Sequence, residues 1–134
     1  PDSILNRIEK NLEFNNKAKQ KKKKANEKKI KQIIKPALES LKQLKNSGQK
    51  FDLIFIDADK ENYINYYDIS IDMVGSGGMI LIDNVLWHGE VTDRSKNDKY
   101  TNIIREFNNH IRKDIRIIKN IIPIGDGLTI CIKK

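Results

Sequence analysis

Two short apolar runs, each ending in acidic or amide side chains, constrain this chain more than any other feature. FDLIFI (residues 51–56) leads into the sequence DADK, and MILI (residues 79–82) leads into DN. Continuous apolar runs of this length are typical of parallel strands that are covered on both faces. In an open α/β sheet, ligands bind beyond the carboxyl ends of such strands, so the polar residues are predicted to converge on one site.

The donors at these two strand ends predict a site for a hard cation. Asp57 and Asp59 follow the first run, and Asp83 and Asn84 follow the second. Carboxylate and carboxamide oxygens suit Mg²⁺, Ca²⁺ or Mn²⁺ and not Zn²⁺. An Asp-x-Asp pair alone is common in loops, and Asp57 and Asp59 could simply be polar residues that end a strand, without a ligand. The second acidic end, one strand further on, favours the functional interpretation.

The remaining pattern predicts alternating strands and helices in one α/β domain over residues 1–134. A helix after Pro36 is expected to end at Gly48, and the sequence around Gly125–Gly127 reads as a hairpin turn. The order βαβαβαβαββ predicts a mostly parallel sheet with an antiparallel C-terminal hairpin strand. The other expected elements are strands at 4–8, 30–34, 115–124 and 128–134, and helices at 11–29, 63–74 and 100–112.

Positive charge is concentrated in the first third of the chain. Residues 1–50 hold 15 Lys and Arg against 5 Asp and Glu, whereas residues 51–134 hold 11 against 13. Residues 10–35 form a Lys-rich segment with two interpretations: a contact for nucleic acid or another acidic partner, or a solvated helix in a Lys-rich composition. Charge patches govern association and not fold, so the composition leaves both open.

Cysteine content and hydropathy predict a cytoplasmic protein. The single Cys131 lies in an alternating strand pattern, provides no disulfide framework and is expected to pack in the core. No run approaches the roughly 20 apolar residues of a membrane span, and residues 1–12 lack the order of a signal peptide. We therefore expect a soluble intracellular protein without a membrane partner.

Three segments resemble a known enzyme family. FDLIFIDADKENY, GGMILIDNVLWHGEV and IIPIGDGLTICIKK are similar to the cation-dependent O-methyltransferases that use S-adenosylmethionine and are related to caffeoyl-CoA and catechol O-methyltransferases. The resemblance implies an incomplete Rossmann-like methyltransferase sheet. The family's first strand and glycine-rich cofactor turn have no counterpart in this sequence, which predicts a truncated, split or decaying relative, or a fragment that needs a second chain.

The resemblance implies roles for the strand-end residues and for parts of the first third. By its pattern, Asp57, Asp83 and Asn84 bind the cation. Asp57 and Asp59 lie beside the cofactor, Glu9 holds its ribose and Ala37 belongs to the stretch that meets its adenine. Lys35 stands where the family commonly has glycine, which would crowd that pocket.

The family pattern also supplies a catalytic residue and two substrate residues. Lys60 matches the lysine that assists deprotonation, and a desolvated lysine beside a cation has its charged form disfavoured. The family pattern places Trp87 near the substrate. It also implies that Arg105 contacts an anionic part of the substrate. The duller interpretations are that Lys60 is an ordinary solvated lysine and that Trp87 belongs to the core. His88 and His110 show no metal-ligand spacing and join no site.

The implied reaction is methyl transfer from S-adenosylmethionine to a hydroxyl whose neighbouring oxygen also chelates the cation. Substrates would be catechol-like phenols, caffeoyl-type thioesters or hydroxyuridine in tRNA, and partners a homodimer mate or a complementing second chain. The alternative is a non-catalytic remnant or basic binding protein. A phosphotransferase using Asp57 and Asp59 ranks last, because that chemistry requires neither Asp83 nor Trp87.

Overall fold

The computed structural model describes residues 30–134, and the chain divides into two compact units, 1–35 and 36–134. In the first unit the described residues, 30–35, form neither helix nor strand. The strand predicted over residues 30–34 is therefore wrong. An apolar run becomes a strand only where a neighbouring backbone exchanges hydrogen bonds with it.

The second unit is an α/β domain, which confirms the predicted fold class. Two short 3₁₀ helices, η2 and η3, interrupt its regular elements. In chain order the elements are α2 (Ala37–Asn46), β1 (Phe51–Ile56), η2 (Lys60–Asn62), α3 (Tyr63–Met73), β2 (Val74–Ile82), η3 (Trp87–Thr92), α4 (Lys99–Lys113), β3 (Ile117–Ile122) and β4 (Leu128–Lys133).

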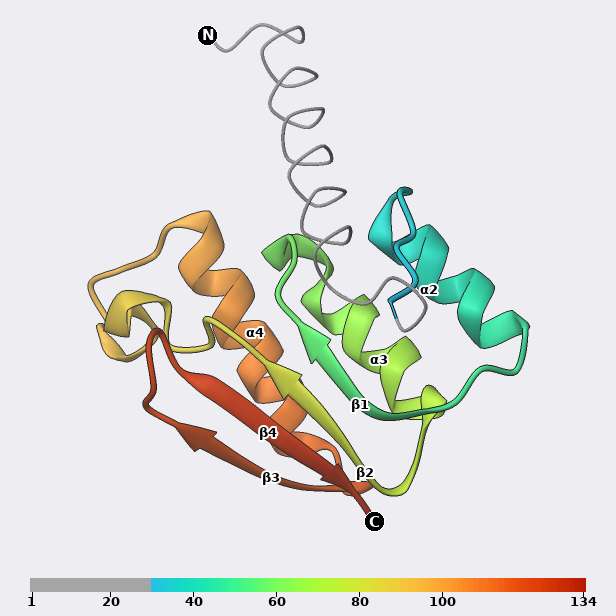
Figure 1. The fold of residues 1–134 in the computed structure, drawn as a ribbon. Coiled ribbons are helices and arrows are strands. Elements are labelled where there is room, and N and C mark those ends of the chain that lie inside the picture. Colours follow the sequence, from blue (N-terminus) through green and yellow to red (C-terminus); the bar gives the residue numbers. More distant parts are fainter. Residues whose placement is uncertain (1–29) are drawn as a thin grey trace, which may run out of the picture. The chain divides into compact units, whose positions relative to one another are not determined.

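The described strands form one sheet in the order β1-β2-β4-β3 (Figure 1). β1 and β2 are parallel, β4 is antiparallel to β2, and β3 pairs with β4 as the predicted antiparallel hairpin. The glycine-rich residues 75–78, before MILI, lie within β2. Phe51 pairs with Val74 but Leu53 pairs with Met79, so β2 carries extra residues as an irregularity opposite β1.

The helices begin and end where local chemistry directs them. Asp98 caps α4, because its Oδ1 accepts the backbone N–H groups of Tyr100 and Thr101, both at 3.1 Å. Basic residues in the last turn of α4 complement its C-terminal dipole. Gly48, at φ +74°, follows α2 as predicted and adopts a conformation that side chains disfavour.

Helices α3 and α4 cover one face of the sheet and form the core with it (Figure 1). Their inward side chains include Tyr63, Tyr67 and Phe107, all fully buried against Ile80 and Ile82 of β2. Ile80 pairs with Cys131 of β4, so the buried thiol lies on the same face of the sheet as Ile80. This confirms the core position predicted for Cys131. Burial raises the pKa of Cys131 to about 12, so it stays a protonated core side chain.

The opposite face of the sheet is apolar and is left open by the described helices. Leu53 and Phe55 of β1 are 49% and 53% exposed, although their sequence predicts a strand covered on both faces. The cross-strand register continues this row through Met79 and Ile132 to Ile118. β1 is also an edge strand among the described residues, so its outer backbone groups have no strand partner there.

Candidate functional site

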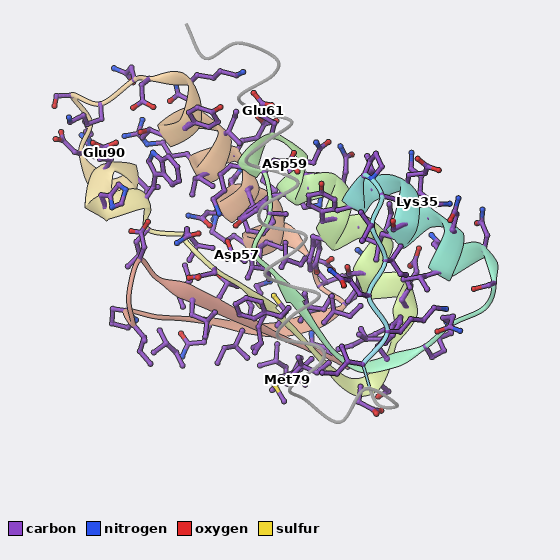
Figure 2. All side chains as sticks on the ribbon, turned by 45° about the horizontal axis from the view of Figure 1, so that its top comes forward. Lys35, Asp57, Asp59, Glu61, Met79 and Glu90 are labelled. Atoms are coloured by element: carbon purple, nitrogen blue, oxygen red, sulfur yellow. The ribbon has the colours of Figure 1, made fainter. Side chains whose placement is uncertain are left out.

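The ends of β1 and β2 lie side by side, as the sequence predicts. Parallel pairing places Ile56 opposite Ile82, and the backbone N–H of Asp83 donates to the carbonyl of Ile56 at 3.1 Å. Asp57 and Asp83 therefore leave neighbouring strands at the same edge of the sheet. Figure 2 labels Asp57 by the end of β1 and Asp59 further along, toward Glu61.

Lys60 joins the two strand ends through its side chain. Its Nζ donates to Oδ1 of Asn84 at 2.7 Å and lies 3.5 Å from Oδ1 of Asp57. The Lys60 side chain is 11% exposed, whereas that of Asp57 is 56% exposed. The ammonium is thus held beneath a carboxylate that opens to solvent, in contact with side-chain oxygens that follow both strands.

Asn84 follows β2 in a constrained conformation. Its φ is +59°, in the left-handed region that residues other than glycine rarely adopt. Its backbone N–H donates to Oδ1 of Asp83 at 2.7 Å, which fixes the orientation of the Asp83 carboxylate. Strain of this kind persists only where surrounding contacts determine it, and it is concentrated at functional sites.

Tyr63, which sequence reasoning missed, connects these groups. Its hydroxyl accepts a hydrogen bond from Nζ of Lys60 and donates to the backbone carbonyl of Asp83 at 3.0 Å. Burial, and then the negative charge of Asp57, raise its pKa well above the ordinary tyrosine value, so the hydroxyl stays protonated. The available signal was its position, three residues after Lys60 at the start of a helix.

Asp59 is held by α3 and not by the Lys60 cluster. The hydroxyl of Tyr66 donates to its Oδ1 at 2.6 Å, and the side-chain amide of Asn62 donates to its Oδ2. Burial opposes ionisation of Asp59, but the hydrogen bonds from Tyr66 and Asn62 outweigh it and lower its pKa. The carboxylate is therefore kept charged and is oriented by α3, and burial raises the pKa of Tyr66 to about 12.

The chemistry of the donors at these strand ends fits a hard cation. Asp57 and Asp83 supply carboxylates and Asn84 supplies an amide oxygen, a set that suits Mg²⁺, Ca²⁺ or Mn²⁺. Within residues 30–134 no three or more His, Cys, Asp or Glu side chains are gathered as a metal site. An ion here would therefore depend on Asn84 and on oxygens from water or substrate, which is usual for Mg²⁺.

The hairpin turn at Gly125–Gly127 fastens the segment that follows Asn84. The N–H of Val85 donates to the carbonyl of Gly127 at 3.1 Å, and the N–H of Leu86 to that of Asp126 at 2.9 Å. A Cβ at Gly127 would lie 2.4 Å from Cγ of Leu86, so only glycine fits at this close approach. The predicted structural role is confirmed, and the turn also supports the site.

Trp87 lies at the start of η3 beside the strand ends. Its φ of +48° and that of His88, +55°, are again left-handed. The indole is half-buried and packs against Tyr100, with ring centroids 5.9 Å apart, and against His88 at 5.6 Å. Trp87 is therefore both attached to the core and partly accessible, an arrangement that suits contact with a planar ligand.

Arg105 holds the η3 loop with all of its donors. Its guanidinium donates to four backbone carbonyls, those of Glu90, Val91, Asp93 and Lys96, and to Oδ1 of Asn102. Because a guanidinium has five N–H groups, none is left for another acceptor. This placement favours a role in shaping the loop between β2 and α4.

Among the described residues, the structure leaves one predicted cofactor residue apart from this cluster. Ala37 is exposed as the first residue of α2, and Glu9 lies outside the described residues, as does most of the Lys-rich segment. His88 is largely exposed, and Nε2 of His110 lies 2.7 Å from Asp68 on the helix surface. Across residues 30–134, no helix is both long and apolar enough to cross a membrane.

Comparison with known protein families gives a match over the whole chain. The profile of the O-methyltransferase family matches residues 1–134. Probable caffeoyl-CoA O-methyltransferase 2 of Dictyostelium discoideum is 42% identical over 108 residues, which cover 78% of this chain and 47% of that protein. Caffeoyl-CoA O-methyltransferase 5 of Nicotiana tabacum is 40% identical over 102 residues, 72% of this chain and 42% of its own length.

Solved structures show the same relationship. An O-methyltransferase from Bacillus cereus in complex with SAH superposes with a TM-score of 0.66 and 34% identity, covering 74% of this chain and 48% of that one. An SAH-bound methyltransferase of Podospora anserina gives a TM-score of 0.71 and 31% identity, covering 85% and 53%. The chain thus spans about half the length of the curated relatives it matches.

Proposed function

The chain belongs to the O-methyltransferase family, and from that premise we propose that it carries the catalytic strand ends of an enzyme that methylates a cation-chelated hydroxyl. One observation carries the proposal: Nζ of Lys60 contacts Asn84 at 2.7 Å and Asp57 at 3.5 Å, across the ends of two parallel strands. A lysine placed between two sets of oxygen ligands is positioned to accept or polarise the proton of a hydroxyl bound beside them.

The proposed methyl donor is S-adenosylmethionine. Relatives in the comparison are bound to SAH, the product that remains after S-adenosylmethionine has lost its methyl group. Asp59 would contact the cofactor, because its carboxylate is fixed by Tyr66 and held ionised. Glu9 and Ala37 are proposed to complete the cofactor contacts from the first third of the chain.

The proposed cation is Mg²⁺, with Ca²⁺ or Mn²⁺ as substitutes, held by Asp57, Asp83 and Asn84. When bound, such an ion would lower the pKa of a chelated hydroxyl and position its oxygen for transfer. Asp83 is preset for this role through its contact with the N–H of Asn84. Asp57, more exposed than Lys60, would be the carboxylate that meets the ion from the solvent side.

Lys60 is proposed as the residue that accepts or polarises the hydroxyl proton at its Nζ. Its stem is nearly buried, so its ammonium form has limited hydration. Positioning completes catalysis, because oxygen, methyl carbon and sulfur must be collinear, and orientation can supply about 7–11 kcal/mol of the barrier. Contacts that fix Lys60 and Asn84 thus contribute directly to rate.

The proposed substrate is a small phenol with two neighbouring oxygens, for which the half-buried indole of Trp87 offers a stacking surface. The relatives named above act, by name, on caffeoyl-CoA, which supports a phenolic acceptor. Arg105 would influence the substrate through the η3 loop, since its donors are engaged there. Hydroxyuridine in tRNA is the second substrate class, favoured by the Lys-rich residues 10–35.

We further propose that a complementing polypeptide, corresponding to the part of the relatives that this chain does not span, covers the open sheet face. The face exposes Leu53 and Phe55, and β1 has a free edge among the described residues. The relatives are about twice as long as the matched region. An added strand beside β1 and a helix over the face would satisfy both features. A homodimer is the competing arrangement.

Calorimetry with S-adenosylmethionine and Mg²⁺ tests the proposal. Heat of binding for both ligands is expected from the chain with its complementing polypeptide, and Asp83→Ala should remove the Mg²⁺ signal. Asp52→Ala is the matched control, because Asp52 is exposed on β1 away from the strand end. Absence of both signals would favour the alternative, a non-catalytic remnant or basic binding protein that contacts an acidic partner.

A further inference from the structure

Tyr63 occupies the junction between the two strand ends. One oxygen, its hydroxyl, accepts from Nζ of Lys60 on the β1 side and donates to the carbonyl of Asp83 on the β2 side. The residue is fully buried at the start of α3. The hydroxyl is therefore a further link between strand ends that are also joined by the backbone contact from Asp83 to Ile56 and by the Lys60 hydrogen bond to Asn84.

The ring of Tyr63 is held independently of its hydroxyl. It packs edge-to-face against Phe107 of α4, with centroids 5.3 Å apart and planes at 74°. Since Phe107 is itself fully buried, this contact sets where the hydroxyl lies. Removal of the oxygen alone would leave the aromatic packing intact, which separates positioning from core stability.

The remaining partners of Lys60 show what the link controls. Three groups surround its Nζ: Oδ1 of Asn84 and the Tyr63 hydroxyl accept hydrogen bonds, and Oδ1 of Asp57 forms an ion pair at 3.5 Å. An ammonium has three N–H groups and no acceptor, so it can serve all three partners. Without the hydroxyl, one donor and the Asp83 carbonyl both lose their partner inside a part-buried cluster, and the side chain gains freedom to leave Asn84.

We propose that Tyr63 is a positioning residue whose hydroxyl fixes Lys60 against Asn84 and joins the ends of β1 and β2. The consequence for cation affinity rests on the proposed function, whereas the joining of the strand ends does not. Groups behind metal ligands commonly change metal affinity 10- to 100-fold when they are removed. Tyr63 would act in this way through Lys60 and through the Asp83 backbone.

Tyr63→Phe tests the proposal, with Tyr67→Phe as the matched control. Tyr67 is also fully buried on α3 and also packs edge-to-face on Phe107, at 6.5 Å, but its hydroxyl donates to Asp114 at 2.7 Å, away from the cluster. Each variant loses one buried hydroxyl on the same helix, which makes two hydrogen bonds in Tyr63 and one in Tyr67. A difference between the two variants at the strand ends therefore reflects where the lost hydroxyl lies and not a general loss of stability.

The first readout is amide hydrogen exchange of Asp83, whose N–H donates to Ile56 across the strand ends. Exchange is expected to quicken about tenfold or more in Tyr63→Phe, relative to amides of the core strands, and to stay near the wild-type rate in Tyr67→Phe. Equal protection of Asp83 in the two variants would overturn the proposal.

The second readout is the affinity for Mn²⁺ alone, measured by calorimetry or electron paramagnetic resonance. Tyr63→Phe should weaken binding about 10- to 100-fold and Tyr67→Phe less than threefold. Unchanged affinity in Tyr63→Phe would contradict the role in cation binding. If the wild-type chain, assayed with its complementing polypeptide, binds no Mn²⁺ but Asp83 exchange still responds to Tyr63→Phe, the cation site of the proposed function fails and the strand-joining role stands.

Discussion

The backbone N–H of Asp83 donates to the carbonyl of Ile56 at 3.1 Å, so the last residue of β1 is bonded to the first residue after β2. This contact extends the parallel ladder by one step beyond the regular pairing of Ile56 with Ile82. It brings a carboxylate from each strand to one edge of the sheet. The candidate chemistry of the chain depends on this local continuation of the ladder.

Lys60→Met is expected to lower kcat for methyl transfer by about 10²- to 10⁴-fold, because it removes the proposed proton acceptor while keeping the apolar stem. The measurement is transfer of a labelled methyl group to a catechol, in the assembly in which the wild-type chain is active. Lys99→Met is the control, since Lys99 forms an exposed ion pair with Glu61. Wild-type turnover in Lys60→Met would rule out the catalytic assignment.

Arg105→Lys is expected to loosen the η3 loop, because an ammonium has three donors where five are in use. The loss of stability should be about 1–3 kcal/mol. Trp87 is the single tryptophan and lies in that loop, so its fluorescence should shift to the red. Arg112→Lys, at an exposed position on α4, should change neither signal. Identical spectra and denaturation midpoints for both variants would contradict the role given to Arg105.

Gly127→Ala is expected to destabilise the chain by about 1–3 kcal/mol, because the new Cβ would clash with Leu86 at a positive φ of 84°. Gly125→Ala is the matched control. Gly125 also has a positive φ, 57°, but nothing lies within 4 Å of a Cβ there. Urea denaturation should show a clearly larger loss for Gly127→Ala, and equal losses would mean that the close approach to Leu86 is unimportant.

Asp114→Asn is expected to lower the free energy of unfolding by about 1.5–3 kcal/mol at pH 7. The hydrogen bonds from Arg116 hold the pKa of this nearly buried carboxyl well below its usual range, and the Tyr67 hydroxyl adds to that effect. A lowered folded-state pKa gives stability that is present above the unfolded value, about 3.9, and is lost as the pH falls toward the folded value. The gap between wild type and variant should therefore narrow below about pH 4.

Denaturation of both proteins across pH 2–8 checks this prediction, with exposed Asp52→Asn as the control. A gap that stays constant down to pH 2 would show that the charge of Asp114 contributes no stability. A gap that widens with acid would contradict the sign of the pKa shift.

Leu53→Lys is expected to leave the fold of this chain intact and to prevent its association with the complementing polypeptide. Leu53 is already 49% exposed on the open face, so a charge there costs little until that face is covered. The measurement is co-purification with a separately expressed segment of a family relative, from the part that this chain does not span. Ile115→Lys, at an exposed position before β3, is the control. Retained co-purification by Leu53→Lys would place the contact elsewhere.

Local patterns were sufficient for much of the fold. FDLIFI predicts β1, because a short apolar run bounded by polar residues has few other structures available to it. The spacing from Tyr63 onward predicts α3, and glycines between two alternating runs predict the β3–β4 hairpin. The same local signal failed at residues 30–34, where an apolar run without a paired neighbour forms no strand.

The sequence alone determined that acidic and amide residues follow β1 and β2, and it indicated the family. Residue type and spacing are sufficient for this, because they specify where strands end and which side chains can bind a cation there. Only the tertiary structure decided which side chains contact one another. It shows that Tyr63 joins Lys60 to Asp83 and that Arg105 donates its hydrogen bonds to the η3 loop. It also shows that one face of the sheet is open. Hydrogen bonds between residues far apart in the chain depend on packing and on side-chain orientation, which no local period encodes.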